Sequence, residues 1–199
     1  NFEMFGGVVN GDVYGGTSIS SIHESEIFNT LKFYGGSLNG NVFGQGLNQK
    51  FFGSSSISLQ GNFTMTGNVF GGSNRTSAVS GSVGKGCSTI TVDSASTTIT
   101  GNIYGGSNVA VDSSSYMEGD TNITLNAGTV SNIYGSGYNC GNTAGTTTTG
   151  KTNITIENGA VNYNIFGGAY HNQARIASNI TVLGGTVHGN IYGGNDNTQ

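Results

Sequence analysis

Polar and apolar residues alternate along short segments that recur through the chain. In each segment an aliphatic residue, mostly Ile, follows Ser, Thr or Asn at every second position. A period of two that is rich in β-branched side chains predicts half-buried β-strands. These segments are residues 56–59, 89–92, 122–125, 153–156 and 179–182.

A second recurring segment ends in Asn, then Ile or Val, then Tyr or Phe, then Gly, mostly with a further Gly. The alternation continues into it, since Val187 and Ile191 fall on one face and Tyr192 on the other. No helical period appears, and the irregular residues 17–33 suit a strand or a short helical turn. The Asn positions are Asp12, Asn41, Asn68, Asn102, Asn132, Asn164 and Asn190. The aromatic positions are Tyr14, Phe43, Phe70, Tyr104, Tyr134, Phe166 and Tyr192.

Two strands per repeat can form either stacked coils or a chain of hairpins. Residues 126–128 and 157–160 are turn-like and would suit hairpins. Stacked coils are favoured, because the same residue type recurs at the same position of each repeat. Coils stacked about 4.8 Å apart would let Asn amides hydrogen-bond and aromatic rings stack from coil to coil. We therefore predict one all-β domain over residues 1–199, a parallel β-solenoid (β-helix) of about seven coils of 26–34 residues.

Each part of the ending has a predicted role in such a coil. The Asn residues form a structural ladder, and the Gly-Gly pair makes a sharp corner at positive φ. The aromatic ladder is either an exposed sugar-binding strip or core, and core is favoured because three of its seven members are Phe. Residues added after the corner should project as loops from one edge.

Composition narrows the function classes. The 199 residues include 36 Gly, no Pro and no Trp, and only 8% are charged. Six Lys and Arg residues in a chain of net charge −4 are too few and scattered for a phosphate-binding surface, so nucleic acid is not an expected partner. No apolar run approaches the ~20 residues of a membrane span, so no membrane insertion is expected.

Catalytic candidates are sparse. β-Helix enzymes that cleave polysaccharides need clustered carboxylates, whereas no two of the ten acidic residues recur at one position of neighbouring repeats. Glu24 and Glu26 are the nearest approach to a catalytic pair, and His171 and His188 share no partner by spacing. The calcium-binding repeat Gly-Gly-x-Gly-x-Asp is missing. We therefore expect no enzyme activity, no cofactor and no metal.

Modification sites are suggested but not established by the sequence. Five Asn residues stand in Asn-x-Ser/Thr triplets, although a chain this rich in Asn, Ser and Thr produces such triplets by chance. Cys87 and Cys140 are either a disulfide or two thiols. The five triplets begin at Asn62, Asn74, Asn122, Asn153 and Asn179.

The segment Asn-Ile-Thr-Val-Leu-Gly-Gly-Thr-Val-His-Gly-Asn-Ile-Tyr-Gly-Gly at residues 179–194 resembles repeats of bacterial adhesin-like surface proteins, including self-associating autotransporter passengers. The resemblance extends over most of the chain from Ile57 onward, with a longer and more variable period. It implies a β-solenoid at the cell surface or outside the cell that mediates adhesion. Glycans or a host or neighbouring cell surface would then be its partners.

The repeat pattern also reaches both ends of the sequence. A partial eighth ending, Phe5-Gly6-Gly7, opens the chain, and Gly193-Gly194 nearly closes it, with no evident cap. Either the sequence belongs to a longer array, or its ends stack on other copies into a fibre, which we favour. The expected function is that of a structural or adhesive protein. One alternative is a carbohydrate-binding or polysaccharide-cleaving β-helix. Another is an ice-binding solenoid, because the polar strand positions would form flat rows of Thr, Ser and Asn.

Overall fold

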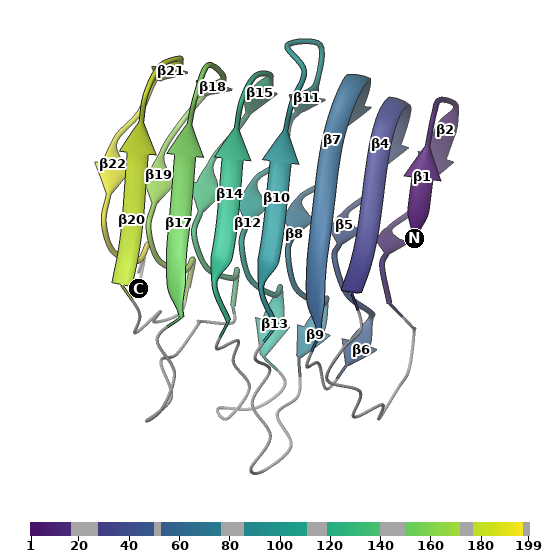
Figure 1. The fold of residues 1–199 in the computed structure, drawn as a ribbon, viewed down its shortest axis with the longest axis horizontal. Coiled ribbons are helices and arrows are strands. Elements are labelled where there is room, and N and C mark those ends of the chain that lie inside the picture. Colours follow the sequence, from purple (N-terminus) through teal and green to yellow (C-terminus); the bar gives the residue numbers. More distant parts are fainter. Residues whose placement is uncertain are drawn as a thin grey trace.

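The computed structural model describes residues 1–16, 28–49, 53–76, 86–110, 119–139, 150–171 and 177–196. These residues form strands and turns, with no helix among them. Every strand pairing is parallel and joins a strand to its equivalent in the neighbouring repeat, as in β10 with β7 and β14. Hairpins would pair antiparallel strands. The predicted parallel β-solenoid is therefore confirmed (Figure 1).

Each coil begins with its longest strand. In two coils this strand continues around the first bend, and in the others a short second strand follows the bend in the same sheet. The first strands are β1 (Phe2–Met4), β4 (Phe28–Asn39), β7 (Ser54–Met65), β10 (Ser88–Val92), β14 (Thr121–Leu125), β17 (Lys151–Ile156) and β20 (Ala177–Val182). The short strands are β2 (Val8–Asn10), β11 (Thr98–Ile99), β15 (Thr129–Val130), β18 (Ala160–Val161) and β21 (Thr186–Val187).

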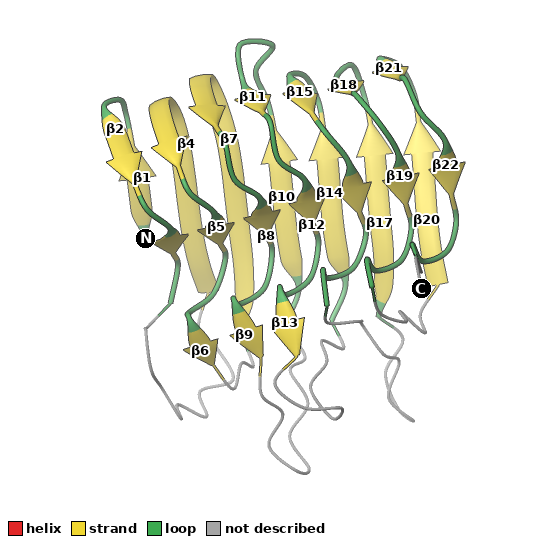
Figure 2. Cartoon of the chain, turned by 180° about the vertical axis from the view of Figure 1, so that it is seen from behind, coloured by secondary structure: helices red, strands yellow, loops and turns green. Residues whose placement is uncertain are grey.

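The Asn-(Ile/Val)-aromatic endings form a second, seven-stranded sheet on the return side of the coil (Figure 2). Its strands are β3 (Val13–Tyr14), β5 (Val42–Phe43), β8 (Val69–Phe70), β12 (Ile103–Tyr104), β16 (Ile133–Tyr134), β19 (Ile165–Phe166) and β22 (Ile191–Tyr192). A third sheet follows the Gly-Gly corner and consists of β6 (Asn48–Gln49), β9 (Arg75–Thr76) and β13 (Val109–Ala110).

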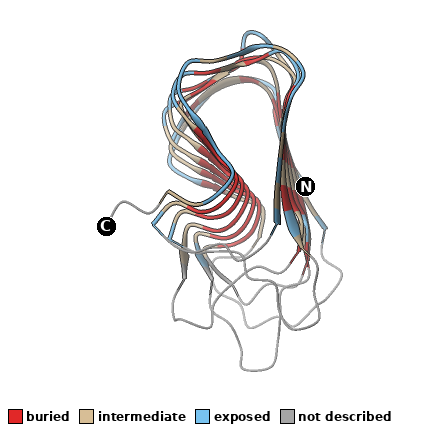
Figure 3. Ribbon diagram, turned by 90° about the vertical axis from the view of Figure 1, so that its left-hand side faces the viewer, coloured by how far each residue is buried: buried red, intermediate tan, exposed pale blue. Residues whose placement is uncertain are grey.

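The coils superimpose closely when viewed along the axis (Figure 3). Seven endings stack, so five coils have a neighbour on both sides and the two terminal coils have one. The Asn positions of adjacent endings are 26 to 34 residues apart. The six internal segments outside the described residues all connect the end of one coil to the long strand of the next, so their points of attachment lie along one edge (Figure 1).

Columns of equivalent apolar residues fill the interior. Ile57, Ile90, Ile123 and Ile154 are aligned one above the other and are at most 1% exposed. The opposite wall contributes the aliphatic residue of each ending, such as Ile103. The core is thin but continuous, because each coil covers the apolar residues of the next.

The ending differs from the single alternating strand that the sequence predicts. A corner separates β11 from β12, and both residues of β12 are buried. Ile103 faces the main core, while Tyr104 on the opposite face packs into a second, aromatic cluster. Successive side chains of the ending therefore still point to opposite faces of the sheet, but both faces are buried against apolar residues.

The prediction that Phe5-Gly6-Gly7 is a partial eighth ending is wrong. Phe5-Gly6-Gly7 lies between β1 and β2 and matches Tyr34-Gly35-Gly36 of the next coil, because Met4 pairs with Phe33 and Val8 with Ser37. Phe5 stacks on Tyr34 with ring centroids 4.8 Å apart. In the irregular segment 17–33, the strand β4 begins at Phe28, and residues 17–27 lie outside the described part of the chain.

Candidate functional site: stacked ladders and two open end faces

The seven Asn-position residues form one continuous column, the asparagine ladder. The side-chain Oδ1 of each member accepts a hydrogen bond from the backbone N–H of the next member, at 2.7 to 3.1 Å. Direct bonds between side-chain amides, which the sequence suggested, are a minority: the Asn132 amide donates to Asn102, and the Asn41 amide to the Asp12 carboxylate. All the backbone bonds run in the same direction, so the column has a donor end and an acceptor end.

The aromatic ladder is a second continuous column. Adjacent rings lie 4.8 to 5.0 Å apart at interplanar angles of 2° to 11°. Its five inner rings are buried, which favours core over an exposed sugar-binding strip. Burial is the main cause that raises the pKa of the Tyr104 and Tyr134 hydroxyls above the ordinary value of 10.0. Tyr104 accepts a hydrogen bond from the Asn102 amide, and Tyr134 donates one to Asp196.

A third column, the hydroxyl row, was missed in the sequence. Its side-chain hydroxyls donate to the carbonyl of the first Gly of the ending, at 2.5 to 2.6 Å. The signal was available, because Ser or Thr stands two residues before the first Ile of all five alternating segments. The members are Ser55, Ser88, Thr121, Thr152 and Ser178.

The Gly-Gly corner was predicted for the wrong reason. None of the glycines that follow the aromatic residue in the seven endings has positive φ. A Cβ on Gly105 would instead collide with the Gly135 carbonyl and lie 2.7 Å from the Cβ of Thr121. Glycine is required because two coils and the hydroxyl row meet at this point.

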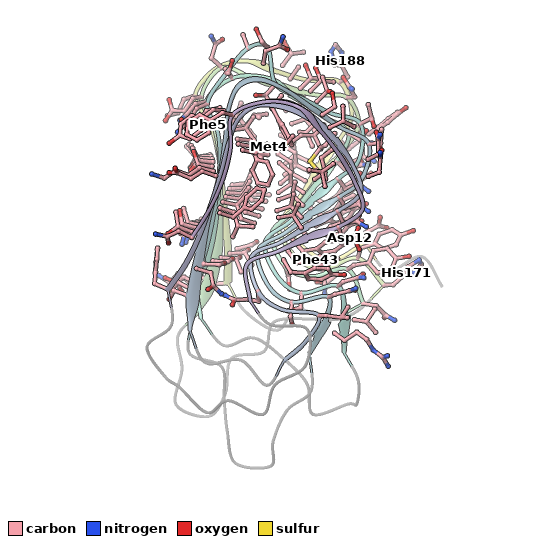
Figure 4. The ribbon with its side chains drawn as sticks, turned by 90° about the vertical axis from the view of Figure 1, so that its right-hand side faces the viewer. Met4, Phe5, Asp12, Phe43, His171 and His188 are labelled. Carbon is pink, nitrogen blue, oxygen red and sulfur yellow. The ribbon has the colours of Figure 1, made fainter. Side chains whose placement is uncertain are left out.

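The two terminal coils leave apolar groups uncovered. The C-terminal end face, made by β20, β21 and β22, exposes 47% of Ile191 and 44% of Tyr192, whereas the equivalent Ile165 and Phe166 are 0% and 7% exposed. The N-terminal end face is made by β1, β2 and β3, with Met4 pointing into the coil interior and Phe5 outward (Figure 4).

One row of outward-facing residues runs from one end face to the other. Each coil contributes the residue that follows the last inward-facing apolar residue before the first bend, such as Asp93 after Val92. We call it the shoulder row. It is polar in the middle, where the Asn126 amide donates to the Asp93 carboxylate at 2.6 Å. It is apolar at both ends, where Phe5 is 73% and Leu183 66% exposed. Its members are Phe5, Tyr34, Gln60, Asp93, Asn126, Glu157 and Leu183.

The outer face of the long strands carries the predicted polar rows in register. Thr91, Thr124, Thr155 and Thr181 are aligned, and the Asn122 row lies beside them. The Asn179 amide donates to Asn153, and the Asn153 amide donates to Asn122. Three of the five triplet asparagines thus already bond one another along the row.

The other two triplets occupy different surroundings. Asn62 is exposed on β7. The Asn74 amide donates to the Tyr14 hydroxyl and its carbonyl accepts from Asn108. Glycosylation at all five positions stays a prediction.

The catalytic and cysteine candidates remain apart or outside the described residues. Glu24 and Glu26 belong to the segment 17–27, which the structure does not describe. His171 and His188 are exposed at different corners of the coil (Figure 4). Cys87 is exposed and has no disulfide partner within the described residues. Cys140 lies outside them, so a Cys87–Cys140 disulfide stays a prediction that the structure does not test.

A small aromatic patch, missed in the sequence, lies beside the aromatic ladder after the Gly-Gly corner. Tyr138 and Tyr170 have ring centroids 4.9 Å apart, and His171 packs against Tyr170 at 4.0 Å. His171 has a φ of 55°, so the backbone turns sharply where this ring projects. The patch is partly exposed and could stack against a sugar ring.

In the described ranges, no three His, Cys, Asp or Glu side chains gather where they could hold a metal ion, and no helix is long and apolar enough to cross a bilayer. Comparison with protein-family models, curated proteins and solved structures finds no match.

Proposed function

We propose that this chain is a structural or adhesive protein of the cell surface or extracellular space, which associates end to end into a fibre or a longer array. The observation that carries the proposal is the repetition of the same contacts from coil to coil: each rung of the asparagine ladder bonds the next, and each ring of the aromatic ladder stacks on the next, so that coils add in register. Uncovered strand edges with apolar side chains are sites of further strand addition.

The interior supports a structural role as well. Ladders that repeat one interaction from coil to coil give a rigid, elongated body, and elongation is what a stalk or fibre requires. The resemblance of residues 179–194 to adhesin-like repeats supports an adhesive role, with glycans or a neighbouring cell surface as partners.

The purified chain tests this proposal directly. Light scattering coupled to size-exclusion chromatography, over a range of concentrations, should give a mass that rises with concentration. Negative-stain microscopy should show particles elongated along the solenoid axis. A monodisperse monomer at all concentrations would overturn end-to-end association.

A carbohydrate-binding protein is the second candidate, and the patch of Tyr138, Tyr170 and His171 favours it. A glycan array should then show binding that Tyr170→Ala abolishes, and release of reducing sugar would identify cleavage. The mixed Thr and Asn rows keep ice binding as a third alternative, which thermal hysteresis would detect.

A further inference from the structure

We propose that Asn62 is the acceptor for an N-linked sugar, and that it is the one of the five Asn-x-Ser/Thr triplets that the folded chain presents for this modification. The triplet is the acceptor motif of N-glycosylation, and its modification requires a place at the surface. The inference does not depend on end-to-end association, because Asn62 lies on β7, which has a neighbouring coil on either side.

The strand β7 presents the triplet Asn62-Phe63-Thr64 toward solvent. Asn62 and Thr64 are exposed, because alternate side chains of a strand share one face. Phe63 between them is 0% exposed and packs against Phe33, with ring centroids 4.8 Å apart. The hydroxyl of Thr64 lies 3.0 Å from that of Ser37 at the same surface. A buried ring thus holds the strand in place while the amide and the hydroxyl of the motif both face outward.

The Asn62 side-chain amide is free of hydrogen bonds to the described residues. The amide nitrogens of the other four triplets each donate one to a neighbouring coil. A sugar attached to one of those nitrogens would have to share the amide with that bond, whereas a sugar on Asn62 displaces no contact. The four bonds run from Asn74 to the Tyr14 hydroxyl, from Asn122 to the Ser88 carbonyl, from Asn153 to Asn122 and from Asn179 to Asn153.

Space on both sides distinguishes Asn62 further. In the preceding coil its paired residue is Gly35, which has no side chain. In the following coil no strand residue is paired with Asn62, because β10 ends opposite Leu59 and β11 begins opposite Thr64. Residues 93–97 between these strands form the turn that projects at the first bend (Figure 1).

The triplets on the flat outer face lack this space. Asn122 is half-buried and is paired with Thr89 on one side and Asn153 on the other. At Asn62 the strand is instead irregular: Gly61 has a φ of 68°, and the register with β4 shifts at this point. Such a bulge bends the strand and leaves a residue outside the ladder. Asn62 therefore stands beside an opening in the sheet, where a transferase can approach it.

The modification needs one co-reactant, a sugar whose C1 carbon is bonded to a diphosphate carried by a lipid or a nucleotide. Nδ2 of Asn62 forms the new bond to C1, and the bond from C1 to the diphosphate oxygen breaks. The diphosphate leaves with that electron pair, and the amide gives up one proton to a base of the transferase. No group is oxidised or reduced.

Glycosylation of the purified, folded chain tests the inference. With a soluble asparagine glycosyltransferase and UDP-glucose, peptide mass spectrometry should find an occupancy at Asn62 at least tenfold above that at Asn122 and Asn153. Synthetic peptides that span the three triplets should be modified to similar extents, because no fold shields them. Equal occupancies in the folded chain would overturn the inference, and so would the same preference for Asn62 among the peptides.

Secretion from a eukaryotic host tests the acceptor in a cell. Peptide N-glycosidase in heavy-oxygen water should label position 62 of the secreted chain, and both Asn62→Gln and Thr64→Ala should abolish this label. Ser37→Ala is the matched control, since it removes the hydroxyl beside Thr64 but keeps the triplet, and should leave the occupancy unchanged. A chain secreted without sugar at Asn62 overturns the inference whether or not it assembles in light scattering.

Discussion

At the scale of single residues, the glycines of the endings are the least replaceable positions. Their side chain is missing because the next coil fills the space, so the requirement depends on a neighbour being present. Gly105 has that neighbour in Gly135 and Thr121, whereas Gly193, at the same position of the last coil, has no atom within 4 Å of an added Cβ.

Gly105→Ala should therefore lower the free energy of unfolding by about 3 kcal/mol, at the upper end of overpacking costs. Gly193→Ala is the matched control and should change it by less than about 0.5 kcal/mol in dilute, unassembled protein. Urea denaturation of both variants measures the difference. Equal effects would show that glycine is needed at this corner for its backbone freedom alone.

The buried tyrosine hydroxyls predict a loss of stability in alkali. Burial raises the pKa of Tyr104 and Tyr134 in the folded state above the value near 10 of an unfolded chain. Their contribution is fully present below about pH 10 and is lost as the pH rises further, because the unfolded chain releases these protons first. The free energy of unfolding should fall by up to about 1.4 kcal/mol per pH unit for each tyrosine.

Tyr104→Phe/Tyr134→Phe supplies the control, since Phe already occupies this column at three other rungs. Thermal or urea unfolding between pH 9 and 12 should show a shallower decline for this variant than for the unmodified chain. Identical pH profiles would mean that these two hydroxyls do not limit alkaline stability.

At the scale of the element, the hydroxyl row ties each long strand to the corner of the same coil. The Thr121 hydroxyl donates to the Gly135 carbonyl inside the molecule, where water cannot replace it. Thr121→Val keeps the shape of the side chain and should lower the free energy of unfolding by about 1–3 kcal/mol, the cost of an unsatisfied buried carbonyl.

Two substitutions on the same strand make this prediction specific. Thr121→Ser keeps the hydroxyl, which Ser88 uses in the same way, and should recover most of the loss. Thr124→Val removes an outward-facing hydroxyl that is partly exposed and should have little effect. If Thr124→Val lowers the free energy of unfolding as much as Thr121→Val in chemical denaturation, the loss comes from placing Val on this strand and not from removing the hydrogen bond to Gly135.

The columns of equal residues were predictable, because stacking by one coil converts a repeat in sequence into a contact in space. Asn102 and Tyr104 could thus be assigned to ladders from spacing alone. The role of Gly105 could not, because it depends on how closely two coils approach. Phe5 was misplaced for a similar reason: an aromatic residue before Gly-Gly also occurs at the first bend, and only strand pairing distinguishes the two sites.

At the scale of the whole molecule, the open end faces predict that single substitutions can block assembly without unfolding the chain. Leu183→Lys places a charge on the C-terminal end face, where Leu183 is 66% exposed, and should reduce the assembled fraction in light scattering at least tenfold if that face takes part in assembly. Thr124→Lys makes the same charge change on the outer face of an inner coil and should leave assembly unchanged. If both variants assemble normally, the shoulder row does not form part of the junction.

The coil-by-coil arrangement has an evolutionary consequence. Each inner coil contacts its two neighbours through the same ladders, so duplicating or deleting a whole inner coil in the gene would restore the ladder contacts at the new junction. A point mutation at Gly105 or Thr121 has no such compensation. Unequal recombination between repeats can therefore change the length of this molecule more readily than drift can change the residues at the centre of a coil.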